Sequence, residues 1–292
     1  MADSSSLMED QPPKAAAPNK SAIRETAKKS RAPRRSSIFS RLKNLATLAA
    51  LILVWQLVST FWLPRIDPYR AVLMPPPSQI IVAAWELLRS GELIHHLLDS
   101  LTREAVAFCA ALLAVPLGIA MGWSSGINSQ LEPVFEVLRP VPPLAWIPLS
   151  ILWFGIGDEQ NEFIIFLGMF FPILLNTTAG VKNVDPNLVR AARSLGAPER
   201  KVLSRVVFKA ALPQIVTGVR IGLGIGWMAL VAAELVGANS GLGFLINDAR
   251  SMLRTDIIIV GMLTIGIMGL IIDASLRMLM RRLLPWSRAM SG

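Results

Sequence analysis

Few side chains in this chain could do chemistry, and those few lie in or beside long apolar runs. Six ionisable residues have this placement: Glu132, Glu136, Arg139, Arg220, Glu234 and Asp273. A charged group is costly in lipid, so such residues by default face a cavity or one another. If they face one another, Arg139 pairs with Glu136 or Glu132 one helical turn away. For Arg220, the structural alternative is that its guanidinium extends along its apolar stem to the cytoplasmic interface.

No catalytic motif accompanies these residues. The sequence has no Gly-x-x-x-x-Gly-Lys-Ser/Thr, no His-Glu-x-x-His and no nucleophile elbow, and Cys109 is its single cysteine. His95 and His96 are adjacent, so on a helix they point in different directions, and no third ligand is near them in the sequence. We therefore predict no catalytic residue and no metal site. If ATP drives this protein, a partner subunit must bind and hydrolyse it.

Composition places these residues in a membrane protein. The chain is 53% hydrophobic with a mean hydropathy of +0.51, which excludes an ordinary soluble domain. Apolar runs of about the 20 residues that a bilayer requires predict an all-α fold with six transmembrane helices. Prolines 140, 142, 143 and 148 predict a kinked third helix. Glycines 218, 222, 224 and 226 predict either close helix crossing or a narrow pathway surface in the fifth. The predicted spans are residues 45–63, 105–123, 133–157, 163–181, 214–236 and 256–278.

The net charge of +9 is best interpreted as a topology signal rather than as a sign of nucleic-acid binding. With the N-terminus inside, the cytoplasmic segments 1–44, 182–213 and the C-terminal tail hold ten, seven and four Lys or Arg residues, and the opposite side holds six. We therefore predict cytoplasmic termini. The predicted parts are a disordered basic tail (1–44), a first membrane helix with an extracytoplasmic linker (45–76), a transmembrane domain (77–285) and a C-terminal tail (286–292). Ser78 is expected to cap an interfacial amphipathic helix.

The polar segment 185–213 between the fourth and fifth spans is predicted to form a helix–turn–helix. Asp185-Pro186 is typical of a helix start, and Gly196 is typical of a helix end. Glu199 falls in the first turn of the second helix, which carries Val206 on its apolar side. A short amphipathic helix pair between two membrane spans can present an apolar surface to a soluble partner.

This segment resembles the cytoplasmic EAA loop of ABC-importer permeases. The match is at Ala191, Ala192, Gly196 and Val206, whereas Arg190 stands where the family often has Glu. The Leu-Pro that ends the older consensus comes four residues later here, as in permeases of the nitrate, sulfonate and taurine type. Further segments that resemble this subfamily are PPPSQIIVAAWELLRSGEL, LRPVPPLAWIPLSILWFGIG and VAAELVGANSGLGFLI, and the resemblance covers residues 74 to 285.

The resemblance implies a type I ABC-importer permease in the cell inner membrane that moves a small anion. The implied partners are a cytoplasmic ABC ATPase dimer, a periplasmic solute-binding protein and a second permease copy. The candidate ATPase-coupling residues are Leu188, Ala191, Ala192, Leu195, Gly196, Ala197, Pro198 and Val206. The candidate pathway residues are Arg139, Asn176, Thr177, Arg220 and Glu234. The alternatives are a secondary transporter, an importer of another small solute such as bicarbonate or a vitamin precursor, and a membrane scaffold that transports nothing.

Overall fold

The computed structural model describes residues 36–283, and every regular element in this part of the chain is a helix. The chain divides into two compact units, with the boundary between Val54 and Trp55. The described part of the first unit, residues 36–54, belongs to helix α2 (Ser36–Leu57). Residues 36–44, which were expected to lie in the disordered tail, are thus helical. Residues 1–35 and the tail 286–292 lie outside the described residues.

The second unit begins with short helical elements. A π-helical turn (Val58–Trp62) leads into α3 (Leu63–Ile66) and α4 (Pro68–Leu73), and α5 (Pro77–Ser90) follows.

The expectation that Ser78 caps α5 is wrong, because Pro76 occupies the N-cap position. Ser78 instead bonds to Gln56: its N–H donates to Oε1 at 3.1 Å, and its hydroxyl accepts from Nε2 at 3.1 Å.

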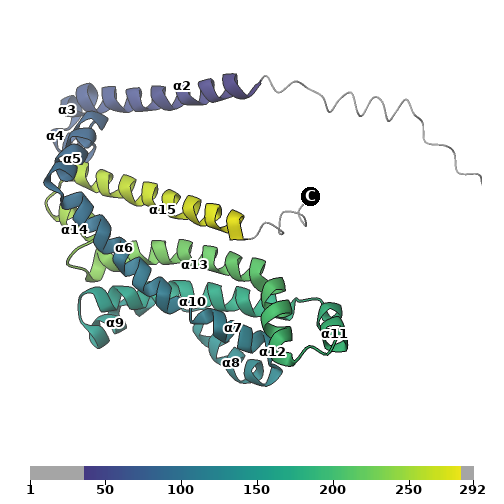
Figure 1. Ribbon diagram of the computed structural model, residues 1–292. Helices are drawn as coiled ribbons and strands as arrows, with labels where there is room; N and C mark the ends of the chain where they lie inside the picture. Colours follow the sequence, from purple (N-terminus) through teal and green to yellow (C-terminus); the bar gives the residue numbers. More distant parts are fainter. Residues whose placement is uncertain (1–35, 284–292) are drawn as a thin grey trace, which may run out of the picture. The chain divides into compact units, whose positions relative to one another are not determined.

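Two long helices, α10 (Asp158–Lys182) and α13 (Phe208–Gly237), form the centre of the second unit. They make the most extensive helix–helix contact and lie side by side (Figure 1). Small residues on α13 allow this closeness. A Cβ added at Gly218 would lie 2.6 Å from Cβ of Asn176. Gly222 and Gly226 likewise face α10, whereas Gly224 has no neighbour within 4 Å, so the predicted close crossing is confirmed for three of the four glycines.

Helices α6 (Glu92–Ala111) and α7 (Ala114–Trp123) pack against α10. On α7, Gly118 and Gly122 take the positions nearest to α10, opposite Thr177 and Val181. The two helices together make one candidate span, residues 92–123, so the predicted start at residue 105 is thirteen residues too late.

The third predicted span is broken. It consists of α8 (Ser125–Leu138), a 3₁₀ turn (Pro143–Trp146) and α9 (Ile147–Phe154), and the two halves meet at 80°. The proline-rich stretch between them causes this break, because proline cannot continue the backbone hydrogen bonding of a helix. The expected kink is therefore confirmed as a sharp bend. Within residues 36–283, five helices are long and apolar enough to cross a membrane, or six with the bent pair counted as one.

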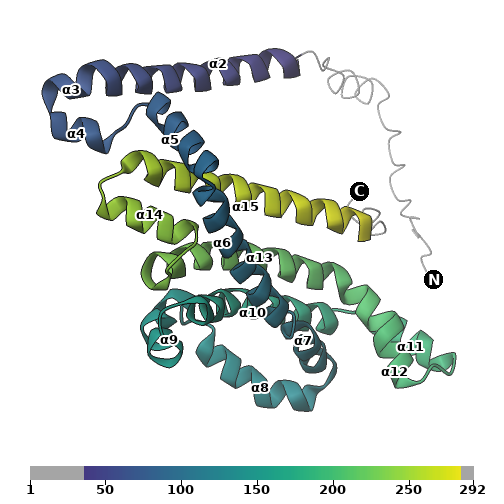
Figure 2. The ribbon, with the colours of Figure 1, turned by 60° about the vertical axis from the view of Figure 1, so that its left-hand side comes forward.

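The predicted loop joins α10 to α13. It contains α11 (Pro186–Ser194), α12 (Glu199–Lys201) and a π-helical turn (Val202–Val207) that runs directly into α13. The fifth candidate span therefore begins at Glu199, so the predicted start at residue 214 is wrong. Helices α14 (Leu242–Ser251) and α15 (Thr255–Leu283) follow. Figure 2 shows α11 and α12 at one end of the α10–α13 pair and α14 near the other.

Candidate functional site

The turn after α11 is fixed by local chemistry. The Asp185 carboxylate caps the helix by accepting the Asn187 N–H at 2.8 Å. At the other end, Gly196 has φ +77°, a left-handed conformation that glycine adopts without strain. The Gly196 N–H donates to the Arg193 carbonyl and the Ala197 N–H donates to the Ala192 carbonyl, which is the Schellman pattern. The predicted helix start and helix end are both confirmed.

The apolar residues of this loop divide between two sides. Val189, Ala192 and Ala197 pack against a cluster whose buried members are Val181, Val202, Val207, Ala211 and Ile215. Val206, in the π-helical turn, is half-buried.

The opposite side of α11 has no such cover. Leu188 is 50% exposed and Leu195 is 88% exposed, and Ala191, between them on the same helix face, is exposed as well. The loop thus presents a small apolar surface, which we call the α11 outer face and define as Leu188, Ala191 and Leu195.

Charged side chains hold α11 against the start of α12. Arg193 donates from Nε to Glu199 Oε1 at 2.7 Å and from Nη2 to Oε2 at 3.0 Å. The hydrogen bonds to Glu199 raise the pKa of the Arg193 guanidinium, so this residue stays charged. Its guanidinium also lies 5.8 Å from the centre of the Trp123 ring at the end of α7.

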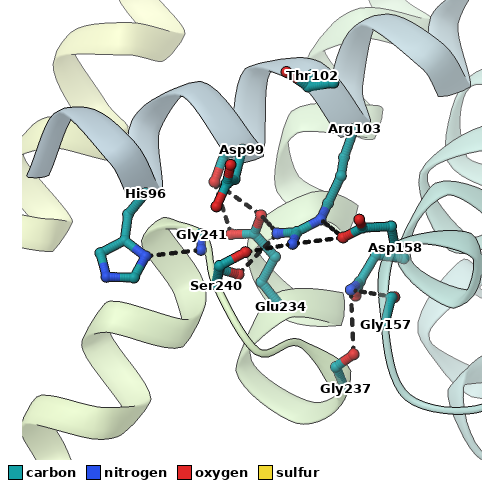
Figure 3. Close-up of polar contacts among 12 residues, drawn as sticks. His96, Asp99, Thr102, Arg103, Gly157, Asp158, Glu234, Gly237, Ser240 and Gly241 are labelled. Carbon is teal, nitrogen blue, oxygen red and sulfur yellow. Dashed lines mark hydrogen bonds and ion pairs between the residues drawn. The ribbon is translucent and has the colours of Figure 1, made fainter. Parts of the chain in front are cut away.

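A second polar group lies at the other end of the α10–α13 pair, centred on Arg103 of α6 (Figure 3). Arg103 Nη1 donates to Glu234 Oε1 of α13 at 2.7 Å, and Nε donates to Asp158 Oδ1 of α10 at 2.7 Å. The same guanidinium donates to the carbonyl and the hydroxyl of Ser240, both at 2.8 Å. We call this group the Arg103 network.

The Glu234 carboxylate is fully hydrogen-bonded within this network. Besides Arg103, its carboxylate accepts from the Ser100 hydroxyl at 2.8 and 2.9 Å and from the Gly243 N–H at 2.9 Å. Its side chain is 0% exposed and that of Arg103 is 5% exposed, whereas Asp158 remains 67% exposed. A buried ion pair is tolerated when further hydrogen bonds satisfy both partners, which is the case here.

Sequence reasoning missed this network because it placed Arg103 and Asp158 outside the spans. Glu234 was expected to line a pathway, but the structure buries it among helices α6 and α13 and the chain that leads into α14. One sequence signal was available. Ser100, Arg103 and Glu104 share the side of α6 that carries Leu93, Ala107 and Ala111, so charged residues occur on its buried stripe.

The other pathway candidates have separate surroundings. Arg220 Nε donates to Asp273 Oδ1 of α15 at 2.9 Å, so it is paired rather than extended alone to the membrane surface. Asn176 and Thr177 lie on α10 opposite Gly218 and Gly118, and Asn176 Nδ2 donates to the Pro172 carbonyl at 2.8 Å. Arg220 thus contacts α15, Asn176 faces α13 and Thr177 faces α7, so the three side chains have different neighbours.

Arg139 ends α8 at the break in the third span. It lines a cavity of about 210 Å³ together with Val141, Pro143, Trp146, Leu167, Gly168, Phe171, Pro172, Leu175 and Ile225. Within the described residues, Arg139 forms no ion pair within 4 Å, so the alternative in which it pairs with Glu136 or Glu132 is not observed. Glu132 Oε1 instead lies 3.6 Å from Lys182 Nζ.

The two histidines come closer to a metal site than the sequence suggested. One ligand atom from each of His95, His96 and Asp99 lies within 4.8 Å of the others, so a third ligand is near. However, His96 Nδ1 accepts the Gly241 N–H at 3.0 Å, and this bond ties the imidazole to the loop of the Arg103 network. His95 Nδ1 lies 3.3 Å from Asp99 Oδ2.

Comparison with known proteins decides the family. Residues 114–288 match the binding-protein-dependent transport system inner membrane component family. The chain belongs to this family. It is 44% identical over 249 residues to the taurine transport system permease protein TauC of Escherichia coli (strain K12), which covers 83% of this chain and 89% of TauC.

Two further relatives are similar over most of their length. The chain is 38% identical to the putative aliphatic sulfonates transport permease protein SsuC of Bacillus subtilis (strain 168), over 86% of this chain and 90% of SsuC. It is 31% identical to the nitrate import permease protein NrtB of Synechocystis sp. (strain ATCC 27184 / PCC 6803 / Kazusa), over 84% of this chain and 90% of NrtB.

A solved structure shares the fold. The inward-facing MetNI methionine ABC transporter has a chain that superposes with a TM-score of 0.57 at 18% identity, covering 68% of this chain and 96% of that one. The predicted all-α permease fold is therefore confirmed. The protein is an inner-membrane permease component of an ABC importer and not an enzyme, as the sequence indicated.

Proposed function

We propose that the chain is the permease of an importer for a small oxyanion of the nitrate, aliphatic sulfonate or taurine class. The support is the identity of 31–44% to permeases named for these three solutes. Family membership removes the secondary transporter and the non-transporting scaffold as alternatives. A different small solute, such as bicarbonate or a vitamin precursor, remains the alternative substrate. In this proposal a periplasmic binding protein delivers the solute.

The α11 outer face is the proposed contact with the cytoplasmic ATPase, and this face carries the mechanistic part of the proposal. Leu195 is 88% exposed on a helix that is capped at both ends, so it adds nothing to the packing of its own chain. The same loop is joined through Ala192, Ala197 and the buried Val202 and Val207 to the start of α13. Force applied at α11 is therefore transmitted to a membrane helix as rigid-body motion.

The division of the loop assigns different roles to the eight candidate residues. Leu188, Ala191 and Leu195 make the outer contact, whereas Ala192 and Ala197 join the loop to its own spans. Val206 lies half-buried in the π-helical turn that continues into α13. Gly196 and Pro198 set the turn between the two helices. Two ATPase sites need two such loops, so the complex contains two permease copies, each with its termini and loop on the cytoplasmic side.

Leu195→Ser tests the contact. Because the side chain is exposed, the variant should fold and melt as the wild type does, while co-purification with the ATPase and ATP hydrolysis stimulated by the loaded binding protein should fall by about tenfold, equivalent to about 1.4 kcal/mol. Met252→Ser is the matched control, since Met252 is 65% exposed in the turn between α14 and α15. Full assembly and full stimulation of Leu195→Ser would refute the contact.

A further inference from the structure

The cavity at the break between α8 and α9 has the composition of a solute site. Arg139 is the one charged residue in its lining, and the remaining lining is apolar or aromatic, with Trp146 and Phe171 among its members. Ligand sites have this character, with an apolar wall and a small number of placed polar groups. The cavity volume of about 210 Å³ has room for several water molecules and therefore suits a small organic anion.

The cavity lies at the middle of the membrane domain. Its α10 residues run from Leu167 to Leu175, in the central part of a 25-residue helix that begins at Asp158. Its α13 residue, Ile225, is likewise central between Phe208 and Gly237. In secondary transporters, which face the same physical problem, solute sites lie near the midplane, where interrupted helices expose polar groups to a cavity. The 80° bend between α8 and α9 is such an interruption.

Arg139 at this depth is unpaired within the part of the chain that the structure describes. Among residues 36–283, no carboxylate oxygen lies within 4 Å of its guanidinium, although Glu136 and Glu132 share with it the lining of an adjoining cavity of about 60 Å³. Arg103 and Arg220, which also lie well inside spans, are both paired with carboxylates. Arg139 is exposed on the surface of this chain, at the depth of the central part of α10, and an unpaired guanidinium at this depth is costly and marks a pathway or ligand position.

We propose that this cavity holds the oxyanion group of the transported solute during its passage, with Arg139 as the ligand residue, an inference that rests on the proposed import of a small oxyanion. The planar guanidinium donates two parallel hydrogen bonds to a sulfonate or nitrate. Trp146, Phe171 and Leu175 contact the apolar body of the solute, so the cavity favours a short alkanesulfonate over nitrate.

The test uses the complete importer, that is the permease, its ATPase and its binding protein, in proteoliposomes. Uptake of labelled taurine, butanesulfonate and nitrate is measured together with ATP hydrolysis for wild type, Arg139→Gln and Arg139→Lys. We expect Arg139→Gln to lower maximal sulfonate uptake by about tenfold or more, the loss of a charge-assisted hydrogen bond. ATP hydrolysis stimulated by the loaded binding protein should stay within twofold of wild type, and Arg139→Lys should lose less uptake than Arg139→Gln.

Controls separate the possible failures. Arg89→Gln removes an exposed arginine at the end of α5 and should change neither quantity. Leu175→Glu leaves the guanidinium in place and supplies a carboxylate within the cavity, so it should also block uptake in an assembled complex. If Arg139→Gln does not assemble, Leu175→Glu decides whether the cavity holds the transported anion.

Three results would overturn the site. One is wild-type uptake by Arg139→Gln or by Leu175→Glu. Another is a parallel loss of uptake and stimulated ATP hydrolysis, which would show a structural role. The third is a reduced yield of assembled Arg139→Gln complex with normal uptake per complex, which would place Arg139 at the contact between permease copies. If wild type itself imports none of the three anions, the proposed substrate class fails, and that result is distinct from all three.

Discussion

The Arg103 network provides a quantitative test of what holds the membrane domain together. Arg103→Met removes the guanidinium and keeps a side chain of similar length. Removing one partner of a buried ion pair costs about 3–5 kcal/mol, because the remaining charge loses its compensation. Here Glu234 keeps the donors of Ser100 and Gly243, and Asp158 is already 67% exposed, so we expect the lower end, about 3 kcal/mol.

The expected change in melting temperature follows from this free energy. For domains of 150–250 residues, 1 kcal/mol shifts Tm by about 2–4 °C, so the loss of about 3 kcal/mol predicts a decrease of about 6–12 °C. The assay is the fraction of detergent-solubilised protein that stays monodisperse after heating, read by size-exclusion chromatography. Arg89→Met, at an exposed position on α5, is the control and should shift Tm by about 1–2 °C at most.

A double variant separates the ion pair from the rest of the packing. Replacement of both members by apolar residues removes the uncompensated charge, so Arg103→Met with Glu234→Leu should lose less stability than the sum of the two single variants. The buried ion pair does not stabilise the domain in this way if Arg103→Met melts within about 2 °C of wild type. The same conclusion follows if the double variant loses as much stability as the two single variants together.

Two other predictions concern glycines and use the same melting assay. Gly218→Ala places a Cβ 2.6 Å from Cβ of Asn176 and should cost about 1–3 kcal/mol, whereas Gly224→Ala has open space and should be neutral or gain up to about 1 kcal/mol from helix propensity. Equal Tm values for these two variants would show that the α10–α13 contact is not limited by space. Gly241→Ala adds a Cβ against the Glu234 carboxylate at a residue with φ +107°, so it should destabilise by at least as much as Gly218→Ala; an unchanged Tm would contradict this.

The turn after α11 could be predicted from sequence because its causes are local. Asp185-Pro186 and Gly196 act through hydrogen bonds to residues two to five positions away, and each of them occupies the predicted position. Hydropathy predicted the spans for a similar reason, since five of them are single apolar helices and the sixth is the bent α8–α9 pair. The break in the third span was likewise visible as a proline cluster.

The ends of the spans could not be predicted, because charged residues within a helix look like its boundary. The second predicted span began just after Arg103, yet this helix extends back to Glu92. The positive charge of Arg103 is compensated by Glu234 of α13. These two residues are 131 positions apart, and a single sequence carries no sign of such a pairing. The fifth span was cut at Pro213 for a related reason, although α13 contains this proline near its start.

A polar network and an apolar cluster fix opposite ends of one helix pair. At one end, Arg103 joins the beginning of α10 to the end of α13 through Asp158 and Glu234. At the other end, the α11 turn packs through Val207 and Ala211 onto the start of α13. Between these ends, α13 glycines bring the helices too close for either to slide without displacing α10 side chains. In the proposed mechanism, a displacement of α11 therefore moves α10 and α13 as one body relative to the bent α8–α9 pair.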